Sequence, residues 1–240
     1  MHAEPFSGSL EEGYHLARLA APDYDALQNR LANSVASHAT PGRALTVLEI
    51  GTGDGVTADA ILRACGWCGV VSVDHDPRMI SRARARLAAW LDAESVVLIN
   101  LDAREYLRQQ EAAAFDLVVS ALTFHNWFSE YRGDVLEEVH RVLKPGGTFV
   151  NADRYAQSPV PHHQTVVSQV SQFFDVFLSA SRPDLLKPWI LHLLEDEHPE
   201  RLMTEEAAVE QLNRLGFEAV EVRVRFGPDA ILCARRPREP

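Results

Sequence analysis

The stretch Val47-Leu-Glu-Ile-Gly51-Thr-Gly53-Asp-Gly55-Val-Thr decides the fold of this chain. It completes an apolar run, Ala44–Ile50, and opens an amphipathic segment, Val56–Ala64. Glycines between a buried strand and a helix allow a tight turn and let a ligand approach the backbone closely. The stretch therefore predicts a strand, a ligand-binding loop and a helix in succession.

The glycine spacing and the nearby charges indicate which ligand the loop binds. The pattern is G-x-G-x-G, whereas a dinucleotide-binding loop reads G-x-G-x-x-G/A and has its third glycine where Val56 stands here. Glu49 and Asp54 add negative charge, which repels a pyrophosphate and attracts a cation. No Gly-Lys-Ser/Thr follows, so a P-loop is excluded. The loop favours S-adenosylmethionine, with its amino group and sulfonium, over NAD.

Short apolar runs alternate with amphipathic segments along most of the chain, which is typical of βαβ units around a parallel sheet covered on both faces. Strands are predicted at Ala44–Ile50, Gly69–Asp74, Ser95–Asn100, Phe115–Ser120 and Thr148–Ala152, with a closing hairpin of Phe217–Arg225 and Ala230–Arg235. Helices are predicted at Val56–Ala64, Pro77–Leu91, Ala103–Gln110, Asp134–Leu143 and Thr204–Leu215. We expect one domain of four segments, and the first two are a helical leader (1–42) and a cofactor-binding core (43–155).

The last two segments of the expected domain are a helical lid (156–200) and a C-terminal helix with the hairpin (201–240). The lid contains no convincing strand and predicts two helices, Gln164–Ser181 and Pro183–Glu195. We expect it to lie over the carboxyl edge of the sheet. Its aromatic residues either wall an acceptor pocket or form a homodimer interface. They are Phe173, Phe174, Phe177 and Trp189.

Acidic residues follow the second and third strands. Asp74 stands 19 residues after Gly55, where an acid can accept hydrogen bonds from ribose hydroxyls. Asp102 and the amide of Ala103 match the exocyclic amine and a ring nitrogen of adenine. Aspartate is also a common helix N-cap, which is the preferred interpretation for Asp76 before Pro77.

As a set, these motifs resemble those of class I S-adenosylmethionine-dependent methyltransferases through about residues 45–153. The matching segments are Glu49-x-Gly51-x-Gly53-x-Gly55, Val73-Asp74, Leu101-Asp102-Ala103, Phe115–Ser120 and Leu143-Lys-Pro-Gly-Gly147. The resemblance implies an α/β, Rossmann-like sheet of seven strands in the order 3-2-1-4-5-7-6. Only strand 7 would be antiparallel, with helices on both faces and the cofactor at the carboxyl ends of strands 1–4.

The resemblance also implies the cofactor site. Pro22–Asp25 resembles a leader of small-molecule and wobble-uridine-modifying members, in which an aromatic residue, here Tyr24, caps the cofactor. Met79 is expected to pack on the adenine or simply in the core. Ser120 and Ala121 are expected on the methionine side. The predicted cofactor site comprises Tyr24, Glu49, Gly51, Thr52, Gly53, Gly55, Asp74, His75, Met79, Asp102, Ala103, Ser120 and Ala121.

The loop after the fourth strand, Ala121–Phe128, faces the transferred methyl in this family. It lacks the Asn/Asp-Pro-Pro-Tyr/Phe sequence of many amine-methylating members, so adenine or glutamine N-methylation is not expected. His125 is the candidate catalytic base because histidine titrates near neutrality, although it can also pack beneath the loop. Asn126 and Trp127 either contact substrate or pack locally. Arg154 either pairs with a substrate carboxylate or forms an internal ion pair, for example with Asp153.

Composition and charge narrow the function classes. The 240 residues include 23 basic and 34 acidic ones, and the net charge of −11 disfavours nucleic acids and anionic membranes as partners. No apolar stretch approaches the ~20 residues that span a bilayer, and the N-terminus lacks a signal-peptide pattern. The odd count of three cysteines suits a reducing compartment, so we expect a cytoplasmic protein with reduced cysteines.

No metal site is predicted, because the histidines and cysteines fit no standard zinc spacing. They are His162, His163, His192, His198 and Cys65-x-x-Cys68. The leading hypothesis is methyl transfer from S-adenosylmethionine to a small molecule by in-line displacement. One alternative is an RNA-modifying enzyme, for which Arg82, Arg84 and Arg86 would be a basic cluster rather than a solvated helix face. Another is a protein that binds the cofactor without transferring methyl groups.

Overall fold

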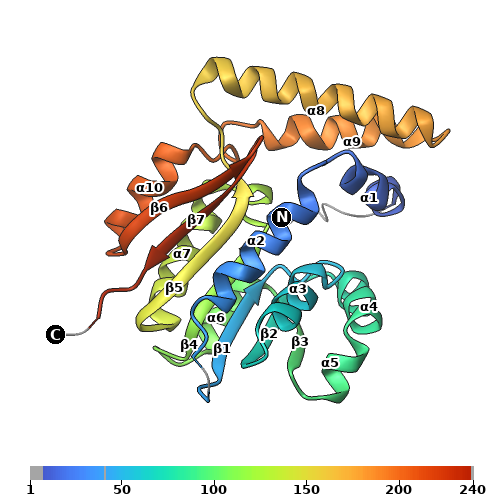
Figure 1. Ribbon diagram of the computed structural model, residues 1–240. Coiled ribbons are helices and arrows are strands. Elements are labelled where there is room, and N and C mark those ends of the chain that lie inside the picture. The colour runs from blue at the N-terminus through green and yellow to red at the C-terminus, as the bar shows by residue number, and fades with distance from the viewer. Residues whose placement is uncertain (1–7, 41, 239–240) are drawn as a thin grey trace.

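A seven-stranded sheet organises the computed structural model, which describes residues 8–40 and 42–238 (Figure 1). The strand order is β3-β2-β1-β4-β5-β7-β6. β1 to β5 pair in parallel, and β7 is antiparallel to both of its neighbours, which confirms the predicted topology. The strands are β1 (Leu45–Ile50), β2 (Cys68–Asp74), β3 (Val96–Asn100), β4 (Phe115–Ala121), β5 (Leu143–Arg154), β6 (Glu218–Phe226) and β7 (Asp229–Arg235).

Helices cover both faces of the sheet because its inner strands are buried on both sides. One face packs against α2 (Tyr24–Ala36), α3 (Val56–Ala64) and α4 (Pro77–Arg86), through apolar side chains such as Leu31 and Ile61. The other face packs against α6 (Ala103–Gln109), α7 (Ser129–Val142) and α10 (Glu205–Arg214), through side chains such as Val139 and Leu212. The result is the three-layer arrangement that the alternation predicts.

A third apolar cluster lies beyond the carboxyl edge of the sheet. It joins α1 (Ser9–Leu19) to α8 (Pro159–Ser179) and α9 (Pro183–Asp196), which run side by side across the top of the molecule (Figure 1). Leu16, Phe177 and Trp189 are among its buried residues. Gly13 permits the close approach of α1, because a Cβ atom there would lie 2.3 Å from Nε1 of Trp189. The segment predicted as a lid therefore lies over this edge, with the leader helix packed against it.

Several element boundaries differ from the predictions. The helix expected over Pro77–Leu91 divides into α4 and a short α5 (Ala88–Asp92), because the backbone leaves the helical region at Leu87. β5 begins at Leu143 and includes the residues predicted as a turn. A 3₁₀ turn, η1 (Phe124–Asn126), was not anticipated and falls in the loop that carries His125. No helix within residues 8–40 and 42–238 is long and apolar enough to cross a membrane.

The structure corrects the prediction that all the cysteines are reduced. Cys65, at the end of α3, and Cys68, at the start of β2, form a disulfide with their Cα atoms 5.7 Å apart. This separation is ordinary for a disulfide. The turn between helix and strand brings the two residues together, which the spacing of two intervening residues did not by itself establish. Cys233 is free and buried in the sheet.

Candidate active site

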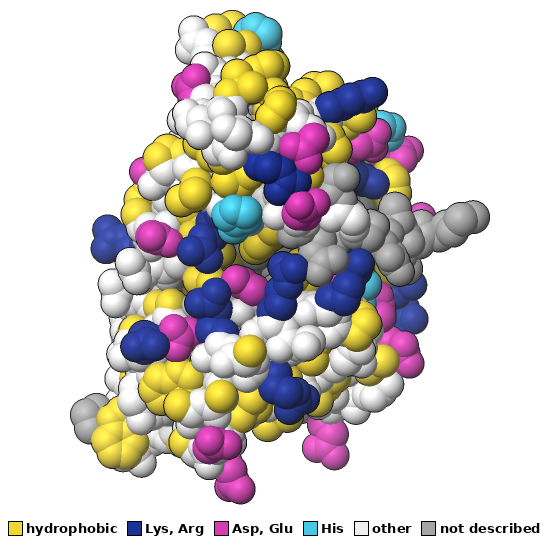
Figure 2. Space-filling view, turned by 90° about the vertical axis from the view of Figure 1, so that its right-hand side faces the viewer, with side chains coloured by type: hydrophobic (Ala, Val, Ile, Leu, Met, Phe, Trp, Pro, Cys, Tyr) yellow, Lys and Arg dark blue, Asp and Glu magenta, His cyan; other side chains and the backbone are white. Residues whose placement is uncertain are grey.

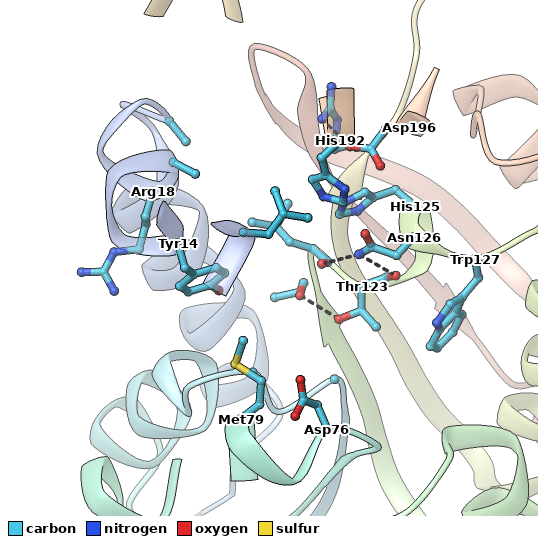
Figure 3. A pocket seen from close by; sticks show the side chains of 18 of the residues that line it. Tyr14, Arg18, Asp76, Met79, Thr123, His125, Asn126, Trp127, His192 and Asp196 are labelled. Carbon is cyan, nitrogen blue, oxygen red and sulfur yellow. Dashed lines mark hydrogen bonds and ion pairs between the residues drawn. The ribbon is translucent and has the colours of Figure 1, made fainter. Parts of the chain in front are cut away.

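A cavity of about 880 Å³ opens at the carboxyl edge of the sheet. Its walls come from the loops after β1 to β4, from the ends of β5 and β7, and from α1, α8 and α9, as the close view in Figure 3 illustrates. Small-molecule sites commonly have volumes of roughly 300–1,000 Å³ and lie at this edge of open α/β sheets. The cavity is therefore the candidate active site.

The glycine loop forms the floor of the cavity. Gly51, Gly53 and Gly55 all have positive φ angles, between 52° and 85°. A Cβ atom on Gly51 would lie 2.1 Å from Oγ1 of Thr123, so only glycine fits beneath the β4 loop. A Cβ atom on Gly53 would meet nothing closer than the Tyr14 hydroxyl at 4.0 Å, so this backbone stays accessible from the cavity. Gly55 does not line the cavity and instead lets α3 pack against Ala83 of α4.

Asp74 holds the glycine loop from the end of β2. Its two carboxylate oxygens accept hydrogen bonds from the backbone N–H of Gly53 at 2.8 Å and of Asp76 at 2.9 Å. Burial raises the pKa of Asp74 and outweighs the effect of these donors. His75 and Met79 line the cavity beside it. Asp76 caps α4 by accepting from the N–H of Arg78, which confirms its predicted N-cap role.

Asp102 both caps a helix and lines the cavity. One of its oxygens accepts from the N–H of Glu105 in α6, and the other accepts from the hydroxyl of Tyr131 at 2.8 Å. Ala103 and Tyr131 line the same wall. Tyr131 could not be found from the sequence, because nothing in the pattern of α7 reveals that its first turn reaches Asp102.

Two predicted cofactor residues act from beneath the cavity rather than in its wall. Glu49 is fully buried, and burial raises its pKa to about 8. It accepts a hydrogen bond from Ser72, whose hydroxyl lies 2.6 Å from that of Thr52 in the loop. Ser120 donates to the carbonyl of Ile50 at 2.8 Å. Both side chains therefore support the loop, whereas Thr52 and Ala121 line the cavity directly.

Two tyrosines of the leader helices face the glycine loop. Tyr24 begins α2 and lines the cavity, as does Tyr14 of α1. The two hydroxyl groups are hydrogen-bonded, and burial raises the pKa of Tyr14 to about 12. Tyr24 was predicted from the sequence and Tyr14 was not, because no motif shows how α1 folds back over the sheet.

His125 and Asp153 form a buried pair at the far end of the cavity. Nδ1 of His125 lies 2.6 Å from Oδ1 of Asp153, which is the penultimate residue of β5. Burial alone would raise the pKa of Asp153, but His125 and backbone N–H donors hold it below its ordinary value. Burial would lower the pKa of His125, but the Asp153 carboxylate more than offsets this and raises it. His125 lines the cavity and Asp153 does not.

The wall around His125 contains all three predicted substrate residues, Asn126, Trp127 and Arg154. The guanidinium of Arg154 is held by Asp196 at 3.0 Å and by Gln169 at 2.8 Å. Its prediction as an internal ion-pair partner is therefore confirmed, with Asp196 rather than Asp153 as the side-chain partner. The cavity is also lined by His192, Asp196 and Asp229, which were not predicted from the sequence as site residues.

Part of the chain matches a known protein domain. Residues 47–147 match the model of a methyltransferase domain, and this segment includes the glycine loop, Asp74, Asp102 and His125. Residues 47–147 therefore carry a methyltransferase domain, for which the sequence motifs predict S-adenosylmethionine as the cofactor.

Individual proteins similar to the chain agree with this. It is 27% identical over 192 residues to 2-methyl-6-phytyl-1,4-hydroquinone methyltransferase 1, chloroplastic, of Oryza sativa subsp. japonica, which covers 80% of this chain and 46% of that protein. It is 27% identical over 128 residues to the highly reducing polyketide synthase verA of Penicillium polonicum, and this match covers 52% of this chain and 5% of that protein. The chain thus spans less than half the length of either protein.

Solved structures share the fold. An S-adenosylmethionine-dependent methyltransferase from Aquifex aeolicus superposes with a TM-score of 0.61 and 17% identity, covering 98% of this chain and all of that one.

The residues present suit the cofactor. The exposed backbone at Gly53, where a side chain would fill the space, gives a ligand access to the loop. The carboxylates of Asp74 and Asp102 line this part of the cavity, and when ionised they complement a sulfonium and an ammonium group. Within the described residues, no three histidine, cysteine, aspartate or glutamate side chains form a group that could hold a metal ion.

Proposed function

We propose that the methyltransferase domain methylates a hydroxyl group of a small molecule, with His125 as general base. The observation that carries this proposal is the His125–Asp153 pair in the wall of the cavity. A neutral amine attacks a methyl group without help, whereas a hydroxyl of high pKa must lose a proton as it attacks. A buried histidine paired with a carboxylate supports the second kind of acceptor. The small-molecule class is also that of the hydroquinone methyltransferase to which the chain is similar.

The mechanism follows from the position of the protons. Because the pKa of Asp153 is lowered, its carboxylate is ionised at neutral pH. The carboxylate then accepts a hydrogen bond from Nδ1 of His125, which carries the ring hydrogen. Nε2 is then the basic nitrogen and takes the proton of the acceptor hydroxyl. Asp153 stabilises the resulting imidazolium and keeps the ring oriented. Bound S-adenosylmethionine supplies an electrophilic methyl group, and holding both reactants in line supplies ~7–11 kcal/mol of the barrier.

We assign the cofactor to the part of the cavity formed by the glycine loop and by the ends of β2 and β3. In this assignment, Asp74 binds the ribose, and Asp102 with Ala103 binds the adenine beside Met79 and His75. Gly51, Thr52, Gly53 and Ala121 lie along the methionine part, with Tyr24 and Tyr14 above it. Glu49, Gly55 and Ser120 contribute by shaping the loop. Asn126 and Trp127 lie on the acceptor side, and Arg154 positions Asp196.

The alternatives fit the structure less well. Figure 2 shows dark-blue basic side chains gathered on the face that carries α1 and α4, where an RNA backbone would have to bind. Carboxylates neutralise part of this charge, since Arg86 pairs with Asp54 at 2.9 Å and Arg78 with Asp76 at 2.8 Å. A protein that only binds the cofactor would have no use for the buried His125–Asp153 pair.

Three further expectations stay predictions. They are the division of the chain into leader, core, lid and hairpin, the homodimer, and the cytoplasmic location. The Cys65–Cys68 disulfide weighs against a cytoplasmic location, because disulfides persist mainly in oxidising compartments.

The proposal is tested by calorimetry and a methyl-transfer assay on the whole chain. We expect S-adenosylhomocysteine to bind, and a radiolabelled methyl group to pass to phenolic acceptors. His125→Ala should keep the cofactor affinity and lose transfer by about 10²–10⁴-fold. His163→Ala, at an exposed position of α8, is the matched control and should retain activity. Full activity of His125→Ala would refute the role of the base.

A further inference from the structure

Two buried acceptor atoms flank His125 in the cavity wall. Within the described residues, neither Oδ1 of Asp196 nor Oδ1 of Asn126 has a hydrogen-bond partner. Figure 3 shows Asp196, His192, His125 and Asn126 gathered at the end of the cavity away from Met79 and Asp76. Asp196 and His125 are close enough for their charges to interact. The acceptor end of the cavity therefore contains hydrogen-bonding capacity that the protein leaves unused.

Asp196 is fixed so that one oxygen stays available. It is the last residue of α9 and is only 5% exposed. Its Oδ2 accepts a hydrogen bond from Nη1 of Arg154 at 3.0 Å, and Nη2 of Arg154 is in turn held by Gln169 at 2.8 Å. With Oδ2 engaged in this way, the carboxylate has little freedom to turn. Its Oδ1 is left without a donor, in a residue that lines the cavity.

Asn126 presents its amide in a similar way. Its Nδ2 lies within donor distance of the carbonyls of Leu122 at 3.4 Å and Thr123 at 3.3 Å. These contacts direct the amide nitrogen toward the chain's own backbone and leave Oδ1 without a donor. Nε2 of His125, the nitrogen not facing Asp153, also accepts when the ring is neutral. The three residues that carry these acceptors, His125, Asn126 and Asp196, all line the cavity.

A buried acceptor without a donor is costly, so a ligand that supplies N–H or O–H groups gains strongly by binding here. The cavity wall also contains apolar and aromatic side chains, from Trp127, Phe128, Phe173, Trp189, Leu191 and Leu193. Flat apolar walls suit a ring, and gathered acceptors suit donors that are close together on that ring. One donor would be the hydroxyl that His125 deprotonates, and another would be its neighbour.

We propose that the acceptor is an aromatic compound with two adjacent hydrogen-bond donors, such as a vicinal diphenol. His125 takes the proton of the hydroxyl that is methylated, and Asp196 Oδ1 accepts a hydrogen bond from the neighbouring hydroxyl. Asn126 Oδ1 accepts from the same pair of donors. Asp196 is then the residue that determines specificity, with Arg154 as its positioning residue. This inference rests on the proposed function, because it uses His125 as the base.

The test uses two compounds that differ by a single hydroxyl, 4-ethylcatechol and 4-ethylphenol. Their affinities are measured by calorimetry on the whole chain in the presence of S-adenosylhomocysteine. We expect the catechol to bind about tenfold or more tightly, because a site built to bind a hydroxyl rejects the analogue that lacks it. Equal affinities, or no binding of either compound, would overturn the proposal.

Asp196→Asn is the decisive variant, because an amide oxygen can still accept from Arg154 while the amide nitrogen replaces Oδ1 in the cavity. The preference for 4-ethylcatechol over 4-ethylphenol should fall below about threefold. The affinity for 4-ethyl-2-methoxyphenol, which has an acceptor in place of the second donor, should rise relative to that for 4-ethylcatechol. Asp175→Ala, an exposed aspartate of α8, should keep the wild-type preference. An unchanged preference in Asp196→Asn would overturn the role of Asp196.

The two proposals fail separately. Selective catechol binding without methyl transfer would refute the proposed function and keep the subsite. Methyl transfer to both phenols at equal efficiency would keep the function and refute the subsite.

Discussion

Nδ1 of His125 lies 2.6 Å from Oδ1 of Asp153, and Asp153 is fully buried. The same carboxylate accepts hydrogen bonds from the backbone N–H of Phe124 at 2.8 Å and of Arg154 at 2.8 Å. One side chain at the end of β5 therefore orients the imidazole and holds the loop that carries it. This arrangement keeps the basic nitrogen of His125 in a single position beside the cavity, as an efficient proton transfer requires.

Replacing this carboxylate should change both the rate of transfer and its pH dependence. The neutral form of His125 is the base, and Asp153 raises the pKa of that histidine, so wild-type activity should rise with a midpoint above 6.5. In Asp153→Asn, the main interaction that offsets burial is lost, so the midpoint should move to lower pH, while the maximal rate falls about 10²–10⁴-fold. The measurement is kcat/KM from pH 5 to 9. An unshifted midpoint would mean that another group titrates.

Removing Asp74 should weaken cofactor binding. Asp74→Ala loses the hydrogen bond that holds Gly53 and the proposed contact with the ribose. We expect the affinity for S-adenosylhomocysteine to fall about 10- to 100-fold, in line with roughly 1–3 kcal/mol for unmade hydrogen bonds. Calorimetry measures this. Asp92→Ala, at an exposed position of α5, serves as the control, and equal affinities in both variants would place the ribose elsewhere.

The close packing of α1 on α9 can be tested by replacing two glycines with alanine, one at the contact and one away from it. In Gly13→Ala the new Cβ would lie 2.3 Å from Nε1 of Trp189, so we expect a loss of about 1–3 kcal/mol in the free energy of unfolding. In Gly133→Ala, within α7, the nearest atom would be Nε2 of Gln211 at 3.5 Å. That variant should gain up to about 1 kcal/mol through helix propensity. Urea unfolding compares them, and equal effects would contradict the close contact.

Glu49 should make the protein less stable as the pH rises. Its pKa is about 8 in the folded protein and near 4.5 in the unfolded chain, so the folded state binds the extra proton between these values. Stability from this group is complete below about pH 4.5 and is lost as the pH rises toward 8, by up to several kcal/mol. Glu49→Gln should abolish that part of the pH dependence. Urea unfolding at pH 5, 7 and 9 measures the difference, and parallel curves for the two proteins would refute it.

Much of the fold could be predicted because it depends on local patterns. The alternation of apolar runs and helical segments, with glycines after the first strand, predicts parallel strands. The carboxyl ends of parallel strands share one edge. Asp74 and Asp102 could therefore be assigned to the same site from their positions alone. Asp153 is the penultimate residue of a strand that ends at this edge too, and that was the available signal for its importance.

The direction of individual side chains was less predictable. Glu49 belongs to the glycine motif, yet its side chain lies beneath the loop beside Ser72, away from the cavity. A sequence motif records that a residue type occurs at a position. It does not show whether the side chain meets a ligand or supports the backbone that does.

The sequence by itself determined the sheet, the glycine loop and the edge at which a ligand binds, because these arise from residues close together in the chain. Only the tertiary structure decided the acceptor end. Asp153 lies 28 residues from His125, and Asp196 lies 42 residues from Arg154. Such pairs depend on how α9 and β5 pack against the η1 loop. That packing is set by contacts between distant segments, which no local pattern encodes.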